Sequence, residues 1–138
     1  MRNILSGFLG GIIGGAAVDL IFITYVGPSA LFSLIGITNR CDVFLGHVLL
    51  GGILGIIFVF ILERLPKYNI WLLGVLWGYF CMLIVGGIPG IFYYCNAPSF
   101  GIIISALGVW TLYGLILATA VFIPSRRRRI HSRQSEQE

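Results

Sequence analysis

Residues 43–62 read VFLGHVLLGGILGIIFVFIL, an apolar run long enough to cross a membrane as a helix. Its one titratable side chain is His47. A helix is the conformation that we expect, because an open strand in lipid would leave its backbone polar groups unpaired. Three further runs of the same character occupy 3–26, 70–93 and 100–123. The sequence therefore predicts an all-α integral membrane protein, a four-transmembrane-helix bundle.

The composition agrees with a membrane protein. Hydrophobic residues make up 58% of the 138 residues and charged residues only 10%, whereas roughly a quarter of residues are charged in soluble domains. This length allows a four-span transmembrane domain over 1–125 and a basic tail over 126–138, which we expect to be disordered and cytoplasmic. The segments outside the spans are too short for a core, so the sequence excludes a soluble catalytic domain. We expect no enzyme activity and no cofactor.

Basic residues indicate how the helices are oriented. With a cytoplasmic N-terminus, Arg2, Arg64, Lys67 and the arginines of the tail all lie inside, and only Arg40 lies outside. Such a bias in short loops follows the positive-inside rule. An even number of spans then places both termini in the cytoplasm. The location that we expect is the plasma (inner) membrane of a prokaryote.

The basic tail begins directly after the fourth apolar run. Such a cluster sometimes binds nucleic acid. After a membrane span it more often holds the helix end against anionic lipid headgroups on the cytoplasmic face, so we expect lipid and no nucleic acid as its partner. The anchoring residues that we expect are Arg126, Arg127, Arg128 and Arg129.

The first apolar run has a second interpretation as a cleaved signal peptide. Arg2, the apolar stretch and the small residues 15–17 fit that pattern. However, the apolar run continues to Val26, which is longer than a signal sequence requires. A retained span is the interpretation that we favour.

Glycine is unusually frequent, with 19 in the chain and most of them inside the apolar runs. Lipid tails do not drive apolar helices together, so small residues that permit close backbone contact favour packing. The glycines that we expect at helix interfaces are Gly7, Gly11, Gly15, Gly51, Gly55, Gly74 and Gly78. The same spacing recurs in Gly10 with Gly14, Gly86 with Gly90, Gly101 with Ser105 and Gly114 with Ala118.

The glycine pattern also suggests an internal repeat. The first and third spans each carry an early Gly-x-x-x-Gly and a later glycine pair, as two tandem helical hairpins would. The alternative is that apolar glycine-rich segments resemble one another by chance, and we favour this alternative.

Two segments near the outer face are expected to depart from straight helices. The apolar segment Ala30–Ile37 is too short to span and should lie in the interface or fold back over the bundle. Pro89 should kink the outer end of the third span, because proline removes a backbone donor.

Asp19 and His47 are the carboxylate and the histidine inside the spans. Counted from the outer ends, they lie at similar depth on consecutive antiparallel helices, so contact between them is geometrically possible. Three interpretations remain: an interhelical link, a proton-accepting site of a transporter or channel, or two residues that never meet. Intramembrane ionisable residues are functional candidates by default, and histidine titrates near neutral pH.

The three cysteines contain no Cys-x-x-Cys motif, and no metal-ligand spacing is present. Cys41 and Cys95 both fall at the outer face, on spans joined by the short 63–68 turn. We expect spans joined by so short a turn to be neighbours, so a disulfide is possible if they run antiparallel and the Cα atoms come within about 7 Å. Reduced thiols are the slightly favoured alternative, and Cys81 should be a buried free thiol.

These observations predict a small non-enzymatic integral membrane protein. Its expected role is that of a structural, assembly or accessory subunit in a homo-oligomer or with other membrane subunits. The alternative is a small transporter or channel that uses the pair Asp19 and His47.

Overall fold

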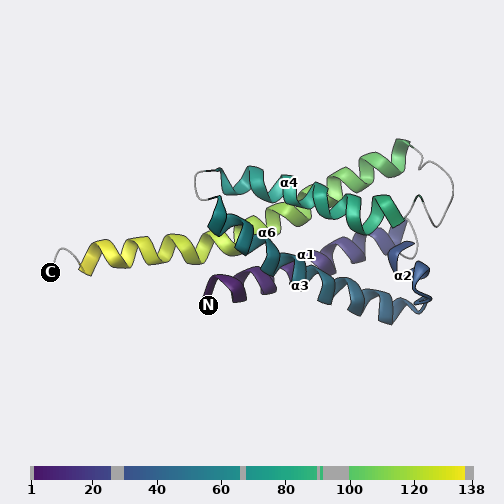
Figure 1. The fold of residues 1–138 in the computed structure, drawn as a ribbon, viewed down its shortest axis with the longest axis horizontal. Coiled ribbons are helices and arrows are strands. Elements are labelled where there is room, and N and C mark those ends of the chain that lie inside the picture. The colour runs from purple at the N-terminus through teal and green to yellow at the C-terminus, as the bar shows by residue number, and fades with distance from the viewer. Residues whose placement is uncertain (1, 26–29, 66–67, 90, 92–99, 136–138) are drawn as a thin grey trace.

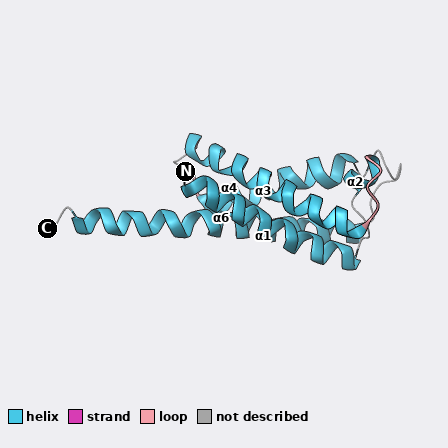
Figure 2. Ribbon diagram, turned by 90° about the horizontal axis from the view of Figure 1, so that it is seen from below, coloured by secondary structure: helices cyan, strands magenta, loops and turns pink. Residues whose placement is uncertain are grey.

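The computed structural model describes residues 2–25, 30–65, 68–89, 91 and 100–135 (Figure 1). Its elements are α1 (Arg2–Tyr25), α2 (Ala30–Leu34), α3 (Arg40–Arg64), α4 (Ile70–Met82), the π-helix η1 (Leu83–Gly87) and α6 (Phe100–Ser135). Four helical segments, namely α1, α3, α4 with η1, and α6, are long and apolar enough to span a membrane. The prediction of an all-helical chain with four candidate spans is confirmed for the described residues (Figure 2).

Asparagine side chains cap the N-termini of two of the four long helices. The side chain of Asn39 accepts a hydrogen bond from the Cys41 amide at 3.1 Å, and that of Asn69 accepts one from the Trp71 amide at 2.9 Å. Both bonds satisfy an amide that the first helical turn leaves without a partner. At its other end α3 stops at Leu65, whose amide bonds back to carbonyls of the last turn. The chain can therefore reverse sharply between α3 and α4.

The helices pack in the order α3, α1, α6, α4, with α1 and α6 in the middle. α3 lies along α1, α4 lies along α6, and α1 lies along α6, whereas α3 and α4 touch only sparsely. The expectation that the second and third spans are close neighbours was therefore wrong. The reason is that α1 carries two adjacent glycine rows, so both α3 and α6 approach its backbone more closely than α3 and α4 approach each other.

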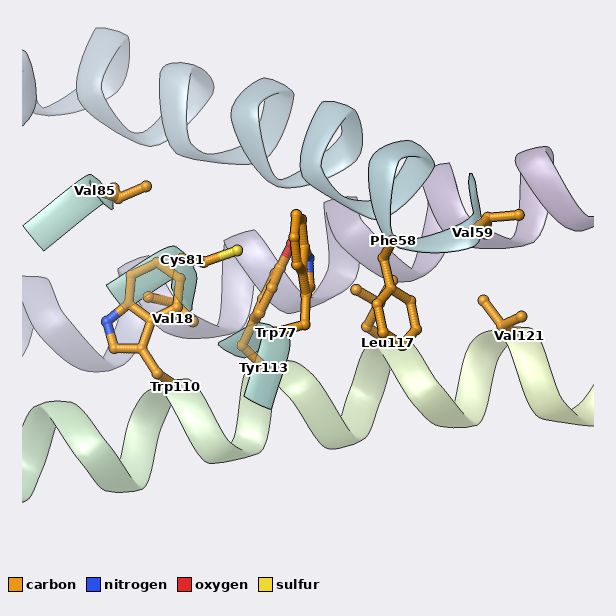
Figure 3. Close-up of a cluster of buried hydrophobic side chains, with 10 residues drawn as sticks. All are labelled: Val18, Phe58, Val59, Trp77, Cys81, Val85, Trp110, Tyr113, Leu117 and Val121. Atoms are coloured by element: carbon orange, nitrogen blue, oxygen red, sulfur yellow. The ribbon is translucent and has the colours of Figure 1, made fainter. Parts of the chain in front are cut away.

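The bundle has two different ends (Figure 1). At one end lie the start of α1, the turn between α3 and α4, and the part of α6 that extends beyond the other helices; we call this the tail end. At the opposite end, the α2 end, α2 lies beside the start of α3 and contacts η1. A cluster of ten buried side chains fills the space between, and Figure 3 shows Phe58, Trp77 and Tyr113 near its centre.

The third span is irregular before Pro89, as expected, but the irregularity is a π-helix. The Ile88 amide donates to the Leu83 carbonyl, five residues back, which defines the wider turn of η1. Pro89 lacks an amide and would crowd the carbonyl four residues earlier in a regular α-helix. A wider turn immediately before it is consistent with relief of that crowding.

The basic tail differs from its predicted disorder. α6 continues without a break from Phe100 to Ser135, past Pro124 and through the four arginines. Arginine is a good helix former, and an existing helix is extended more easily than a new one is begun. Only the backbone of this extension is described, so the anchoring role of Arg126–Arg129 stays a prediction.

Candidate functional site

Asp19 of α1 and His47 of α3 meet inside the bundle. Asp19 Oδ1 lies 2.5 Å from His47 Nδ1, and the two side chains are 1% and 12% exposed. The pair sits in the half of the bundle nearer the α2 end. Of the interpretations that the sequence left open, the one in which the two residues never meet does not describe this structure.

The polar atoms of this pair are incompletely satisfied. The contact has the distance of an ion pair, but His47 Nδ1 makes no well-aligned hydrogen bond within the described residues. Asp19 Oδ2 is fully buried and likewise has no hydrogen-bond partner there. Buried polar groups are nearly always hydrogen-bonded, and exceptions often mark a functional group. The described residues therefore leave the hydrogen-bonding capacity of this pair partly unused.

Direct backbone contact between α1 and α3 brings the pair together. Gly15 lies four residues before Asp19 on α1. A Cβ added to Gly15 would lie 2.7 Å from the His47 carbonyl oxygen. One added to Gly7 would lie 2.5 Å from the Gly55 carbonyl oxygen, and Gly11 faces Gly51 even more closely. Real Cβ atoms do not approach this closely, so only glycine permits this distance between the helices.

The same kind of contact joins α4 to α6. A Cβ on Gly74 would lie 2.5 Å from the Gly114 carbonyl oxygen, and one on Gly78 would collide with the Trp110 carbonyl. All seven glycines expected at helix interfaces therefore lie against another helix. By contrast, an added Cβ at Gly86 or Gly101 would meet nothing within 4 Å, so this spacing also occurs on open faces of the chain.

A small cavity lies beside His47. It measures about 10 Å³ and is lined from α1, α3, η1 and α6. Val85 of η1 and Trp110 and Tyr113 of α6 form the wall that faces the histidine. This volume is near the lower limit for one water molecule. The cavity therefore has room for one water molecule at most.

Tyr113 lines the cavity and also contacts the interface between α1 and α3. Its hydroxyl donates to the Gly51 carbonyl at 3.3 Å, and its ring packs against Gly14, where an added Cβ would lie 2.7 Å away. α1 and α6 both reach α3 at Gly51. The sequence reasoning missed Tyr113, although a tyrosine in mid-span, away from the interfacial aromatic belts, was an available signal.

α2 covers the site at its own end of the bundle. The Phe32 ring, only 7% exposed, meets the His47 ring edge-on with centroids 4.8 Å apart. The same ring fills the space above Gly46, where a Cβ would lie 2.6 Å from its Cζ atom. As one of the two expectations for the segment Ala30–Ile37 has it, α2 lies against the bundle; its position relative to the membrane interface stays a prediction.

The cysteines lie apart from this site. Cys41 is an exposed free thiol at the start of α3, and Cys81 is completely buried in the core. Cys95 lies outside the described residues, so the structure does not decide between a disulfide with Cys41 and the slightly favoured reduced thiols. Among the described residues, no three His, Cys, Asp or Glu side chains are grouped closely enough to hold a metal ion.

No protein-family model, curated protein or solved structure matches this chain.

Proposed function

We propose that this chain is a small membrane transporter in which Asp19 and His47 together bind and release a proton. The observation that carries the proposal is the buried pair with an unpartnered carboxylate oxygen. An ionisable group inside a membrane protein costs at least about 2.5 kcal/mol to insert, so its presence indicates a role that an apolar residue could not perform.

The interhelical-link interpretation explains less of the geometry. α1 and α3 already touch through glycine at three levels, so they do not need an ion pair to hold them together. A purely structural bridge would also be expected to satisfy both carboxylate oxygens. In this site one oxygen remains without a partner in the described structure. Proton exchange accounts for both facts.

The titratable groups around the pair are few. Asp19 comes from α1 and Tyr113 shares the cavity with His47, whereas the neighbouring residues Phe32 of α2 and Val85 of η1 are apolar. The tyrosine hydroxyl already donates to a backbone carbonyl. The exchangeable proton is therefore assigned to the pair, and the proton itself is the proposed transported species.

Proton flux into liposomes tests this proposal. We expect the reconstituted protein to dissipate an imposed pH gradient, and Asp19→Asn, which preserves shape but cannot exchange a proton, to reduce the flux to that of empty liposomes. Tyr79→Phe serves as the matched control, because it removes a half-buried hydroxyl between α4 and α6 without touching the pair. Absence of flux from the wild-type protein would contradict the proposal.

A second candidate function is that of a structural, assembly or accessory subunit. It is favoured by the open small residues Gly86, Gly101 and Gly108, because such faces pack against other helices in lipid. Its partner would be another copy of the chain or a different membrane subunit. Light scattering of the protein purified in mild detergent tests this: a monomer with nothing co-purified would count against it.

The orientation proposed for either role has both termini in the cytoplasm of a prokaryotic cell, with the chain in the plasma membrane. The distribution of basic residues supports it. A C-terminal fluorescent-protein fusion should be bright and an alkaline-phosphatase fusion inactive; the opposite pair of results would reverse the orientation.

A further inference from the structure

We propose that α2 is a lid over the Asp19–His47 pair and that Phe32 is the residue that controls access to the histidine from the α2 end. The inference rests on the proposed exchange of protons at this pair. It adds the side from which the site opens and the residue that has to move.

Phe32 occupies the place that a lid residue requires. Its ring stands edge-on to the imidazole at a centroid distance of 4.8 Å and an interplanar angle of 79°. It also covers Gly46, one residue before the histidine, where any side chain would displace it. The His47 side chain keeps an exposed fraction of 12% beneath this contact.

The short helix is attached on both sides of the site. α2 packs against η1, while Phe32 rests on α3, so the segment bridges the two spans that touch each other only sparsely. The gap between α3 and α4 is the one place in the bundle where two sequence-adjacent spans lack close backbone contact. A lid at this gap can open without breaking any of the glycine contacts that hold the bundle together.

The C-terminal end of α2 has a defined backbone structure, at which we expect the lid to turn. The Ile37 amide donates to the Phe32 carbonyl at 2.9 Å and the Gly36 amide to the Ser33 carbonyl at 3.1 Å. Gly36 has a φ of 80°, which a residue with a side chain rarely adopts. This pattern is a Schellman motif, and it sets the position of Phe32 through the glycine. A Cβ added at Gly36 would meet no atom within 4 Å, so a side chain there acts through the backbone of the turn and not through a new contact.

The neighbouring element is also adapted to movement. η1 is a π-helix with two glycines, and Gly86 has open space around it. π-helical turns are often found at functional sites, where a small rotation changes the exposed face. Val85 of this segment lines the cavity beside His47, so motion of η1 would open the cavity and the lid together.

Chemical labelling of the histidine tests the lid without requiring any transport. The chain has 2 histidines, so a His131→Asn background leaves His47 as the only one. Diethyl pyrocarbonate acylates a neutral imidazole, and peptide mass mapping in lipid nanodiscs gives the rate at His47. We expect Phe32→Ala to raise this rate by roughly tenfold, the ratio that about 1.4 kcal/mol of lost closure would produce.

Three further variants make the result specific. Phe32→Leu keeps apolar bulk over the imidazole and should label more slowly than Phe32→Ala. Gly36→Ala strains the hinge without contacting the site and should speed labelling. Leu34→Ala, an exposed position on the same short helix, should label like the wild type. If Phe32→Ala does not fold, Gly36→Ala and Phe32→Leu decide the outcome.

A Phe32→Ala rate equal to the wild-type rate would overturn the lid, as would an equal acceleration in Leu34→Ala. A wild-type protein without proton flux, combined with fast labelling of Phe32→Ala, would remove the proposed transport and keep the lid. The two proposals can therefore fail separately.

Discussion

The bundle contains two helix pairs, α1 with α3 and α4 with α6. They are packed in the same way but differ in their polar contacts. In each pair, glycines bring the backbones of two helices into direct contact. The first pair adds an ionisable contact between Asp19 and His47. The second adds a neutral one, in which the hydroxyls of Tyr79 and Thr111 lie 3.0 Å apart.

The two helix pairs therefore share their glycine packing and differ in whether their polar contact is ionisable. Glycine contacts and a neutral hydroxyl contact hold α4 on α6, so close packing of two helices in this bundle does not require an ionisable pair. A pair of hydroxyls carries no charge near neutral pH, whereas aspartate and histidine are both ionisable side chains. The first pair of helices therefore holds the ionisable groups, whereas Val85 of η1 and Trp110 and Tyr113 of α6 line the cavity beside His47.

The largest effect should come from separating the backbones. Leucine at both Gly51 and Gly55 would push α3 away from α1, and we expect a loss of at least about 3 kcal/mol in the free energy of unfolding, or no folded protein. Leucine at both Gly74 and Gly78 should act in the same direction on α4 and α6. Unfolding of the monomer in mild detergent, followed by circular dichroism, measures both.

The matched control for these variants is leucine at both Gly101 and Gly108, which have open space around them. This variant should unfold like the wild-type monomer, and any loss of self-association in it would support the second candidate function. Wild-type stability in the Gly51 and Gly55 variant would mean that this face of α3 looks toward lipid.

A smaller effect should distinguish the two polar contacts. Double-mutant cycles on Asp19 with His47 and on Tyr79 with Thr111 measure the coupling energy within each pair. We expect about 1.7 kcal/mol for the ionisable pair, the upper end for contacts between membrane helices, and about 0.6 kcal/mol for the hydroxyls. Equal coupling in both cycles would remove the energetic difference between the two helix pairs.

The smallest effect concerns the thiols, whose labelling should leave stability unchanged. In the first pair of helices Cys41 is exposed, and in the second Cys81 is fully buried, so alkylation without reductant should modify Cys41 and spare Cys81 until unfolding. Intact-mass analysis also decides whether Cys41 and Cys95 form a disulfide. Protection of Cys41 together with Cys95 would support the disulfide, and rapid labelling of Cys41 would exclude it.

Much of the architecture could be predicted from the chain because span length and hydropathy are local properties. Four apolar runs of sufficient length leave the helix as the one conformation that satisfies the backbone in lipid. The two glycine rows of α1 could also be read directly, since residues four apart share a helix face. The residues that form the polar pair were visible for the same reason: Asp19 and His47 stand out in an apolar background.

Only the tertiary structure decided which helices touch and what closes the site. Sequence order suggested that α3 would pack on α4, but it packs on α1. This pairing requires glycines on the facing surfaces of both α1 and α3, so it depends on the two helices together. Contact between Asp19 and His47 requires a particular rotation and register of two helices, which neither helix specifies alone. The position of Phe32 depends on a turn at Gly36 and on the space above Gly46, two features that meet only in the folded chain.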